Sequence, residues 1–107
     1  MNEKMPGFKE NIPSSENVKE VFEKLLGTQE YTETRKCEDE QGLYLWDVTI
    51  PQADGYAEYS YMRKGRHAQG GEASDTAIHV TFYDQDGFPV GGHSVAKYED
   101  GEWVVTP

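Results

Sequence analysis

The stretch at residues 77–98, AIHVTFYDQDGFPVGGHSVAKY, decides the fold. Its first seven residues alternate, with Ile78, Val80 and Phe82 on one side and smaller or more polar residues between them. A period of two is typical of a strand with one buried face. Asp86-Gly87 is a preferred pair for a two-residue type I′ hairpin turn. The stretch therefore predicts an antiparallel hairpin, and the straight register would set Ile78 against Val95.

Four more segments have the alternation and the β-branched or aromatic content of strands. They are residues 31–38 (YTETRKCE), 43–50 (LYLWDVTI), 56–62 (YAEYSYM) and 102–106 (EWVVT). Tyr44, Trp46, Val48 and Ile50 fall on one face of the second, and Pro51 is expected to close it. Short turns at Gln41-Gly42, 53–55 and Asp100-Gly101 join these segments. Links this short favour antiparallel neighbours, because parallel pairs need long crossovers.

One amphipathic helix precedes the strands. Its apolar residues fall at i, i+3, i+4, i+7 and i+8, which makes one helical face; they are Val18, Val21, Phe22, Leu25 and Leu26. Ser14 and Ser15 can cap its start, and Gly27 can end it. A helix of about 12 residues is marginal alone in water, so we expect it to pack on the sheet.

The sequence thus predicts an α+β fold, with one N-terminal amphipathic helix packed on a curved antiparallel sheet of five or six strands. Residues 1–13 are predicted to be a flexible N-terminal arm, and residues 14–107 a single α+β domain. In its helix-then-sheet architecture the chain resembles the cystatin-like fold, whose sheet wraps around a helix.

The charge balance bears on partners and location. Twenty Asp and Glu face ten Lys and Arg among 107 residues, for a net charge of −10. Such a surface repels phosphate backbones and anionic membranes, so no direct nucleic-acid or membrane partner is expected. The single cysteine, Cys37, allows no internal disulfide. With no signal-peptide pattern at its start, the chain is predicted to be cytoplasmic.

A basic, glycine-rich loop is the first candidate site. Residues 63–71 (RKGRHAQGG) gather Arg63, Lys64, Arg66 and His67. Glycine N–H groups and forked guanidinium donors suit an anionic ligand. The loop lacks the P-loop pattern, and a hairpin tip whose bases pair with Glu72 and Asp75 is the alternative.

Other polar residues give weaker signals. A metal site at His79 and His93 would need both imidazoles on one face, and the straight register puts His79 opposite Ser94 and His93 opposite Val80. Residues 84–87 (DQDG) resemble part of a calcium loop but suit a turn better. Cys37 has no identifiable base nearby. We therefore predict no catalytic residue, metal or cofactor.

Tyrosine and tryptophan are more numerous than one layer against a helix requires. Tyr56, Tyr59, Tyr61 and Tyr83 are candidates for a protein-interaction surface, since aromatic residues are enriched in interfaces. Cross-strand pairing that only stabilises the sheet is the alternative.

Three functions follow. We favour a small acidic, non-enzymatic module that binds another protein. The first alternative is a binder of small anionic ligands, or a minor enzyme, that uses the 63–71 loop. The second is an acidic inhibitor that mimics nucleic acid. The chain is expected to be a monomer, or a homodimer joined through an edge strand.

Overall fold

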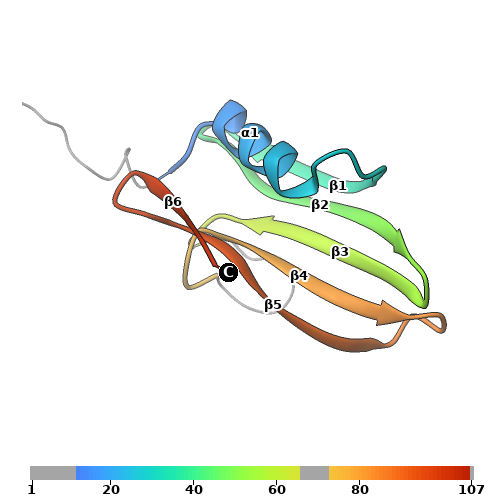
Figure 1. Cartoon of the computed structure of the whole chain (residues 1–107). Helices are drawn as coiled ribbons and strands as arrows, with labels where there is room; N and C mark the ends of the chain where they lie inside the picture. Colours follow the sequence, from blue (N-terminus) through green and yellow to red (C-terminus); the bar gives the residue numbers. More distant parts are fainter. Residues whose placement is uncertain (1–11, 66–72, 107) are drawn as a thin grey trace, which may run out of the picture.

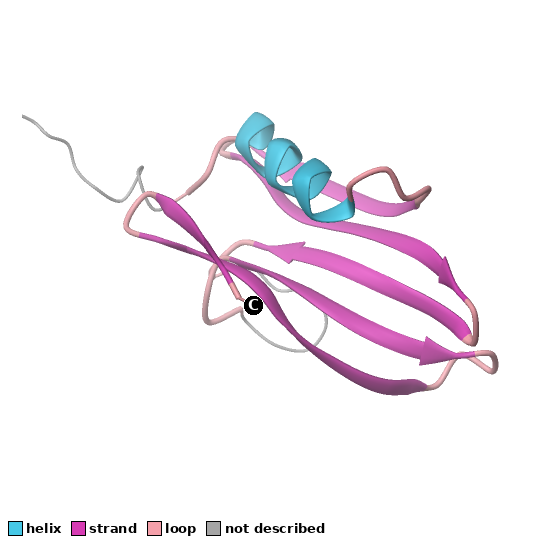
Figure 2. Cartoon of the chain, in the orientation of Figure 1, coloured by secondary structure: helices cyan, strands magenta, loops and turns pink. Residues whose placement is uncertain are grey.

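The chain forms one helix and six strands, in the order α1 (Ser15–Leu26), β1 (Thr32–Asp39), β2 (Gly42–Gln52), β3 (Gly55–Met62), β4 (Ala77–Asp84), β5 (Pro89–Glu99) and β6 (Glu102–Val105). The computed structural model describes residues 12–65 and 73–106. The strand order in the sheet equals the order along the chain, and every neighbouring pair is antiparallel. Figures 1 and 2 show a twisted, open sheet with α1 along one face. The predicted α+β class and antiparallel sheet are confirmed, with six strands.

The predicted N-terminal position of the helix needs correction, because the helix begins only at Ser15. Ser14 has an extended backbone, and its hydroxyl accepts a hydrogen bond from the Asn17 N–H at 3.1 Å. This capping bond fixes the first turn. Gly27 ends the helix with φ of 64°, which glycine adopts without strain. Most of the predicted arm, residues 1–11, lies outside the described residues.

The core lies in one layer between α1 and the sheet face that it covers. The helix contributes Val18, Phe22 and Leu26, all buried, while Val21 and Leu25 are partly buried beside them. The sheet contributes a larger set: Leu43, Trp46, Val48, Ile50, Ala57, Tyr61, Ile78, Val80 and Val95. The rings of Phe22 and Trp46 meet with centroids 4.7 Å apart. The amphipathic face of the helix thus packs as the sequence predicted.

Two irregularities in the β1–β2 ladder change which side chains reach the core. Cys37 pairs with Leu45 and Glu38 with Leu43, so Tyr44 is the extra residue of a bulge. Leu43 consequently turns into the core, although strict alternation had set it on the opposite face from Trp46. A second irregularity, at Thr34, lies between the Glu33 and Arg35 pairings.

The hairpin of β4 and β5 has a different turn from the predicted one. The Gly87 N–H donates to the Asp84 carbonyl at 3.0 Å, and Gly87 has φ of 85°. This is a three-residue loop in which one glycine takes the left-handed conformation. Two further shifts along the ladder leave His79 opposite Ser94, as predicted, but set Ile78 against Ala96 instead of Val95.

Pro51 does not close its strand, since β2 continues to Gln52. It pairs with Tyr56 of β3. On its other side, β1 pairs with β2 only as far as Thr49. No β1 residue therefore needs an N–H donor at this position, and proline is tolerated at such an edge.

Candidate functional site

The sheet face opposite α1, here called the outer face, carries a row of polar side chains, one from each of five strands. The ladders pair Arg35 with Asp47, Asp47 with Ser60, Ser60 with His79, and His79 with Ser94. Residues paired across antiparallel strands point to the same face. These five residues, here called the polar row, therefore cross the sheet from β1 to β5.

Asp47 is the buried centre of the polar row, with 4% of its surface exposed. Its carboxylate accepts a hydrogen bond from Arg35 Nε at 3.1 Å and one from the Ser60 hydroxyl at 2.5 Å. Arg35 Nη2 also lies 3.0 Å from the same carboxylate. A buried carboxylate is tolerated when it is paired and hydrogen-bonded in this way.

A second carboxylate, that of Glu58, lies beside the polar row on β3. Burial raises the pKa of Glu58 above its ordinary value, and the negative charge of Asp47 raises it further. The Tyr83 hydroxyl donates to Glu58 at 3.5 Å, a long contact that acts in the opposite direction. Tyr83 in turn stacks on Tyr56, with ring centroids 4.8 Å apart. The cost of burying the Glu58 charge is thus less well compensated by hydrogen bonds and ion pairs than that of Asp47.

The polar row and Glu58 line an open hollow of about 760 Å³ on the outer face. This volume lies in the range of ligand sites. Met62, Ala73 and Thr81 add to its lining. The Ser94 hydroxyl oxygen is buried and has no hydrogen-bond partner among the described residues. It therefore has unused hydrogen-bonding capacity at the edge of the hollow.

The charges around the hollow favour a positively charged guest. Its lining contains one arginine and two carboxylates, so the lining carries one excess negative charge when the histidines are neutral. Arg35 is already bound to Asp47. A guest ammonium or guanidinium group near Glu58 would be attracted by a partly desolvated charge, and such attraction is stronger than in bulk water.

Nucleophilic catalysis has less support from the same residues. The Ser60 hydroxyl donates to the Asp47 carboxylate, which is also paired with Arg35, whereas the base beside an activated serine is most often an imidazole. The imidazole of His79 makes no hydrogen bond to any described residue, although His79 pairs with Ser60 in the ladder.

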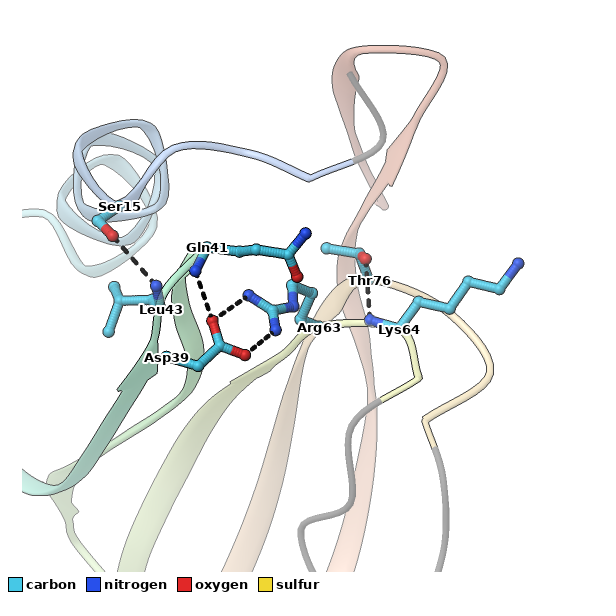
Figure 3. A network of polar contacts seen from close by, with 7 residues as sticks. All are labelled: Ser15, Asp39, Gln41, Leu43, Arg63, Lys64 and Thr76. Carbon is cyan, nitrogen blue, oxygen red and sulfur yellow. Dashed lines mark hydrogen bonds and ion pairs between the residues drawn. The ribbon is translucent and has the colours of Figure 1, made fainter. Parts of the chain in front are cut away.

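Arg63, the first residue of the predicted basic loop, is held inside the fold (Figure 3). It is only 3% exposed. Its guanidinium donates two hydrogen bonds to the Asp39 carboxylate, one of them 3.1 Å long, and lies over the Tyr44 ring. The Arg63 N–H also donates to the Tyr44 carbonyl at 3.0 Å. This side chain joins the end of β3 to the β1–β2 turn.

The other members of the basic loop are placed separately. Lys64 is exposed, and its backbone N–H donates to the Thr76 hydroxyl at 3.0 Å. Figure 3 shows the Lys64 side chain pointing away from Arg63. Arg66 and His67 lie outside the described residues. The described part of the loop therefore does not bring two free cations together.

The four candidate tyrosines are divided between the two faces. Tyr56 and Tyr83 lie on the outer face and are partly exposed. Tyr59 packs against the core, and Tyr61 is fully buried in it. Burial raises the pKa of Tyr61 above its ordinary value. Only the stacked pair of Tyr56 and Tyr83 is thus accessible to a partner on the outer face.

The minor candidates also have definite places. His79 pairs with Ser94, and His93 pairs with Val80, the residue next to His79. Adjacent residues of a strand point to opposite faces, so the two imidazoles lie on opposite faces of the sheet. The Asp84 carboxylate accepts from the N–H groups of Asp86 and Phe88 in the turn, each at 2.9 Å. Within residues 12–65 and 73–106, no group of three or more His, Cys, Asp or Glu side chains could hold a metal ion.

Reasoning from the sequence missed the polar row. One signal was available: Asp47 interrupts an otherwise apolar strand, LYLWDVTI. Its partner Arg35 comes from a strand whose register depends on a bulge, and a shift of one residue reverses the face of every later side chain. The pairing of Arg35 with Asp47 follows directly after the irregularity at Thr34.

In the described part of the chain, no helix is long and apolar enough to cross a membrane. Comparison with family models found no match. Neither a curated protein nor a solved structure matches the chain. The case for a function therefore rests on the hollow of the outer face and the residues that line it.

Proposed function

We propose that this chain is a non-enzymatic binding module whose outer face takes up a positively charged segment of another protein. The observation that carries the proposal is the hollow lined by the polar row and Glu58, in which two carboxylates face one arginine. Electrostatic complementarity of this kind selects partners and speeds their encounter. The net charge of −10 attracts the same class of partner over a longer range.

The partner is a protein segment rather than a nucleic acid, because the overall charge repels phosphates. The stacked rings of Tyr56 and Tyr83 lie beside Glu58 and offer an apolar surface next to the carboxylate. A lysine or arginine side chain combines a charged end with an apolar stem. Such a side chain would place its charge at Glu58 and its stem along the two rings.

A direct test uses Glu58→Gln, which removes the charge and keeps the shape. Glu20→Gln is the matched control, since it removes the same charge from the exposed face of α1. Both variants and the parent would be titrated with an arginine- and lysine-containing peptide and followed by amide chemical shifts. We expect shifts at Glu58, Ser60 and Thr81, and about tenfold weaker binding for Glu58→Gln alone.

The same titration gives a pH profile with a defined direction. Because the pKa of Glu58 is raised, its carboxylate is protonated at a higher pH than an ordinary one. Affinity for a cation should therefore fall as the pH falls through this raised pKa, and Glu58→Gln should remove that part of the fall.

Capture from a native lysate would then identify the natural partner. The proposal predicts that Glu20→Gln retains the partner and Glu58→Gln loses it. Equal capture by both variants, or peptide shifts spread over the acidic residues of α1, would contradict it.

A further inference from the structure

Half of β5 has a free edge. The strand runs from Pro89 to Glu99, but β6 pairs only with its last four residues, Ala96–Glu99. One more bond, from the Thr106 N–H to the Val95 carbonyl at 2.7 Å, ends that contact. Residues 89–94 have β4 on one side and no described strand on the other. Figure 1 shows this part of β5 at the border of the sheet, beyond the end of β6.

The backbone along this free edge is unusually accessible. Gly91 and Gly92 lie in its middle and carry no side chains to shield the N–H and C=O groups. Packing within the chain requires glycine at position 92, because a Cβ there would lie 2.6 Å from the Val80 carbonyl oxygen. No such constraint from the described residues applies at Gly91, since a Cβ there would meet nothing within 4 Å. Phe88 and Val90 at the end of the edge are each 66% exposed.

The opposite edge of the sheet is protected in the ways that prevent strand addition. β1 has the sequence TETRKCED, in which five of eight residues are charged, and its ladder is irregular at two places. Charges and bulges discourage pairing with another chain, but only the charges distinguish the two borders, because the β4–β5 ladder is also irregular at two places. The run FPVGGHSV at residues 88–95 contains no Asp, Glu, Lys or Arg. The two borders of the sheet thus differ in charge.

We propose that the first half of β5 pairs edge to edge with the same segment of a second copy of this chain. The two strands would run antiparallel about a two-fold axis near Gly91 and Gly92, joining two sheets into one. Charge argues for a second copy at this place. Most contacts between two chains of net charge −10 bring acidic groups together, whereas this run meets itself without any charged side chain.

This inference does not rest on the proposed function, because it uses the backbone at the border of the sheet, although Gly92, His93 and Ser94 also line the hollow. The test compares the full-length chain with Val90→Lys, which places a charge at each end of the paired edges. Thr28→Lys is the matched control: it adds the same charge at an exposed position next to β1. Sedimentation equilibrium at physiological salt would give the dissociation constant, with circular dichroism to verify that each variant is folded.

We expect a reversible dimer for the parent and for Thr28→Lys, and about tenfold weaker association for Val90→Lys. Hydrogen exchange supplies a second readout that does not depend on a variant. Those amides of residues 90–94 that do not bond to β4 should become protected as the protein concentration rises. A monomer at all concentrations, equal association of all three proteins, or protection already complete in dilute solution would each overturn the proposal.

Discussion

A cation is held most firmly where the fold buries it against an anion, and Arg63 is such a residue. Arg63→Ala removes two charge-assisted hydrogen bonds to Asp39 and the contact with the Tyr44 ring. We expect the free energy of unfolding to fall by about 3 kcal/mol, the usual cost of breaking a buried ion pair from one side. Urea unfolding would measure it.

Lys64→Ala is the control for Arg63→Ala, because Lys64 is the next residue and its side chain is exposed. It should change stability by less than about 0.5 kcal/mol. If both variants lower the free energy of unfolding by the same amount, the contact between Arg63 and Asp39 does not contribute specifically to stability.

Arg63 also marks a limit of prediction at this scale. The sequence places it in a basic loop, because no apolar pattern continues past Met62. The chain nevertheless stays in register for one more residue, through the bond from the Arg63 N–H to the Tyr44 carbonyl. That contact joins residues 19 positions apart, and local patterns carry no information about it. The same reason hid the partners of Asp47.

At the scale of elements, a side-chain hydrogen bond connects the β5–β6 hairpin to the helix. The Trp103 indole N–H donates to the Asn17 side-chain oxygen at 2.8 Å, and its ring packs against Tyr61 and Tyr98. Trp103→Phe keeps an aromatic ring and deletes the donor. We expect a loss of about 1 kcal/mol in the free energy of unfolding, measured by urea denaturation.

A double-mutant cycle would isolate this bond. Asn17→Ala should destabilise the parent more than it destabilises the Trp103→Phe variant, since the bond is already absent there. Identical effects in both backgrounds would show that the bond adds nothing.

The helix and the strands were largely predictable from the sequence, whereas the turns that connect them were less so. Periodicity predicted α1 and five of the strands, because burying one face imposes a repeat of 3.6 or 2 on the sequence. The turn signal at Asp86-Gly87 predicted the remaining strand, β5. At Asp100-Gly101, both residues have positive φ, 52° and 82°, as a type I′ turn requires. The similar pair Asp86-Gly87 forms a longer loop, in which Asp84 accepts the backbone N–H groups. Dipeptide preference could not distinguish these two cases.

At the scale of the whole molecule, the net charge of −10 opposes the compact state through mutual repulsion. Sodium chloride screens this repulsion, so thermal stability should rise between low and physiological ionic strength. Calorimetry in a buffer of fixed pH would measure the midpoint. The charge was evident from the sequence, whereas the meeting of Arg35, Asp47 and Glu58 on the outer face depended on the three-dimensional registers.

Glu20→Gln combined with Glu23→Gln provides the comparison. Both residues lie on the exposed side of α1, so the variant removes two negative charges and leaves the core unchanged. Its midpoint should respond less to salt than that of the parent. A fall in the midpoint on addition of salt would mean that attractive pairs, such as Arg35 with Asp47, outweigh the repulsion.

The identity between strand order and chain order bears on how the molecule folds. Each strand finds its neighbour directly before or after it, so most of the sheet can form with small losses of loop entropy, and topologies of this kind fold fast. The bond between Asn17 and Trp103 spans 86 residues and is the exception. We therefore expect the strands to assemble before this bond forms. In refolding of a Trp46→Phe variant, hydrogen-exchange protection at the centre of β2, β3 and β4 should precede the change in Trp103 fluorescence.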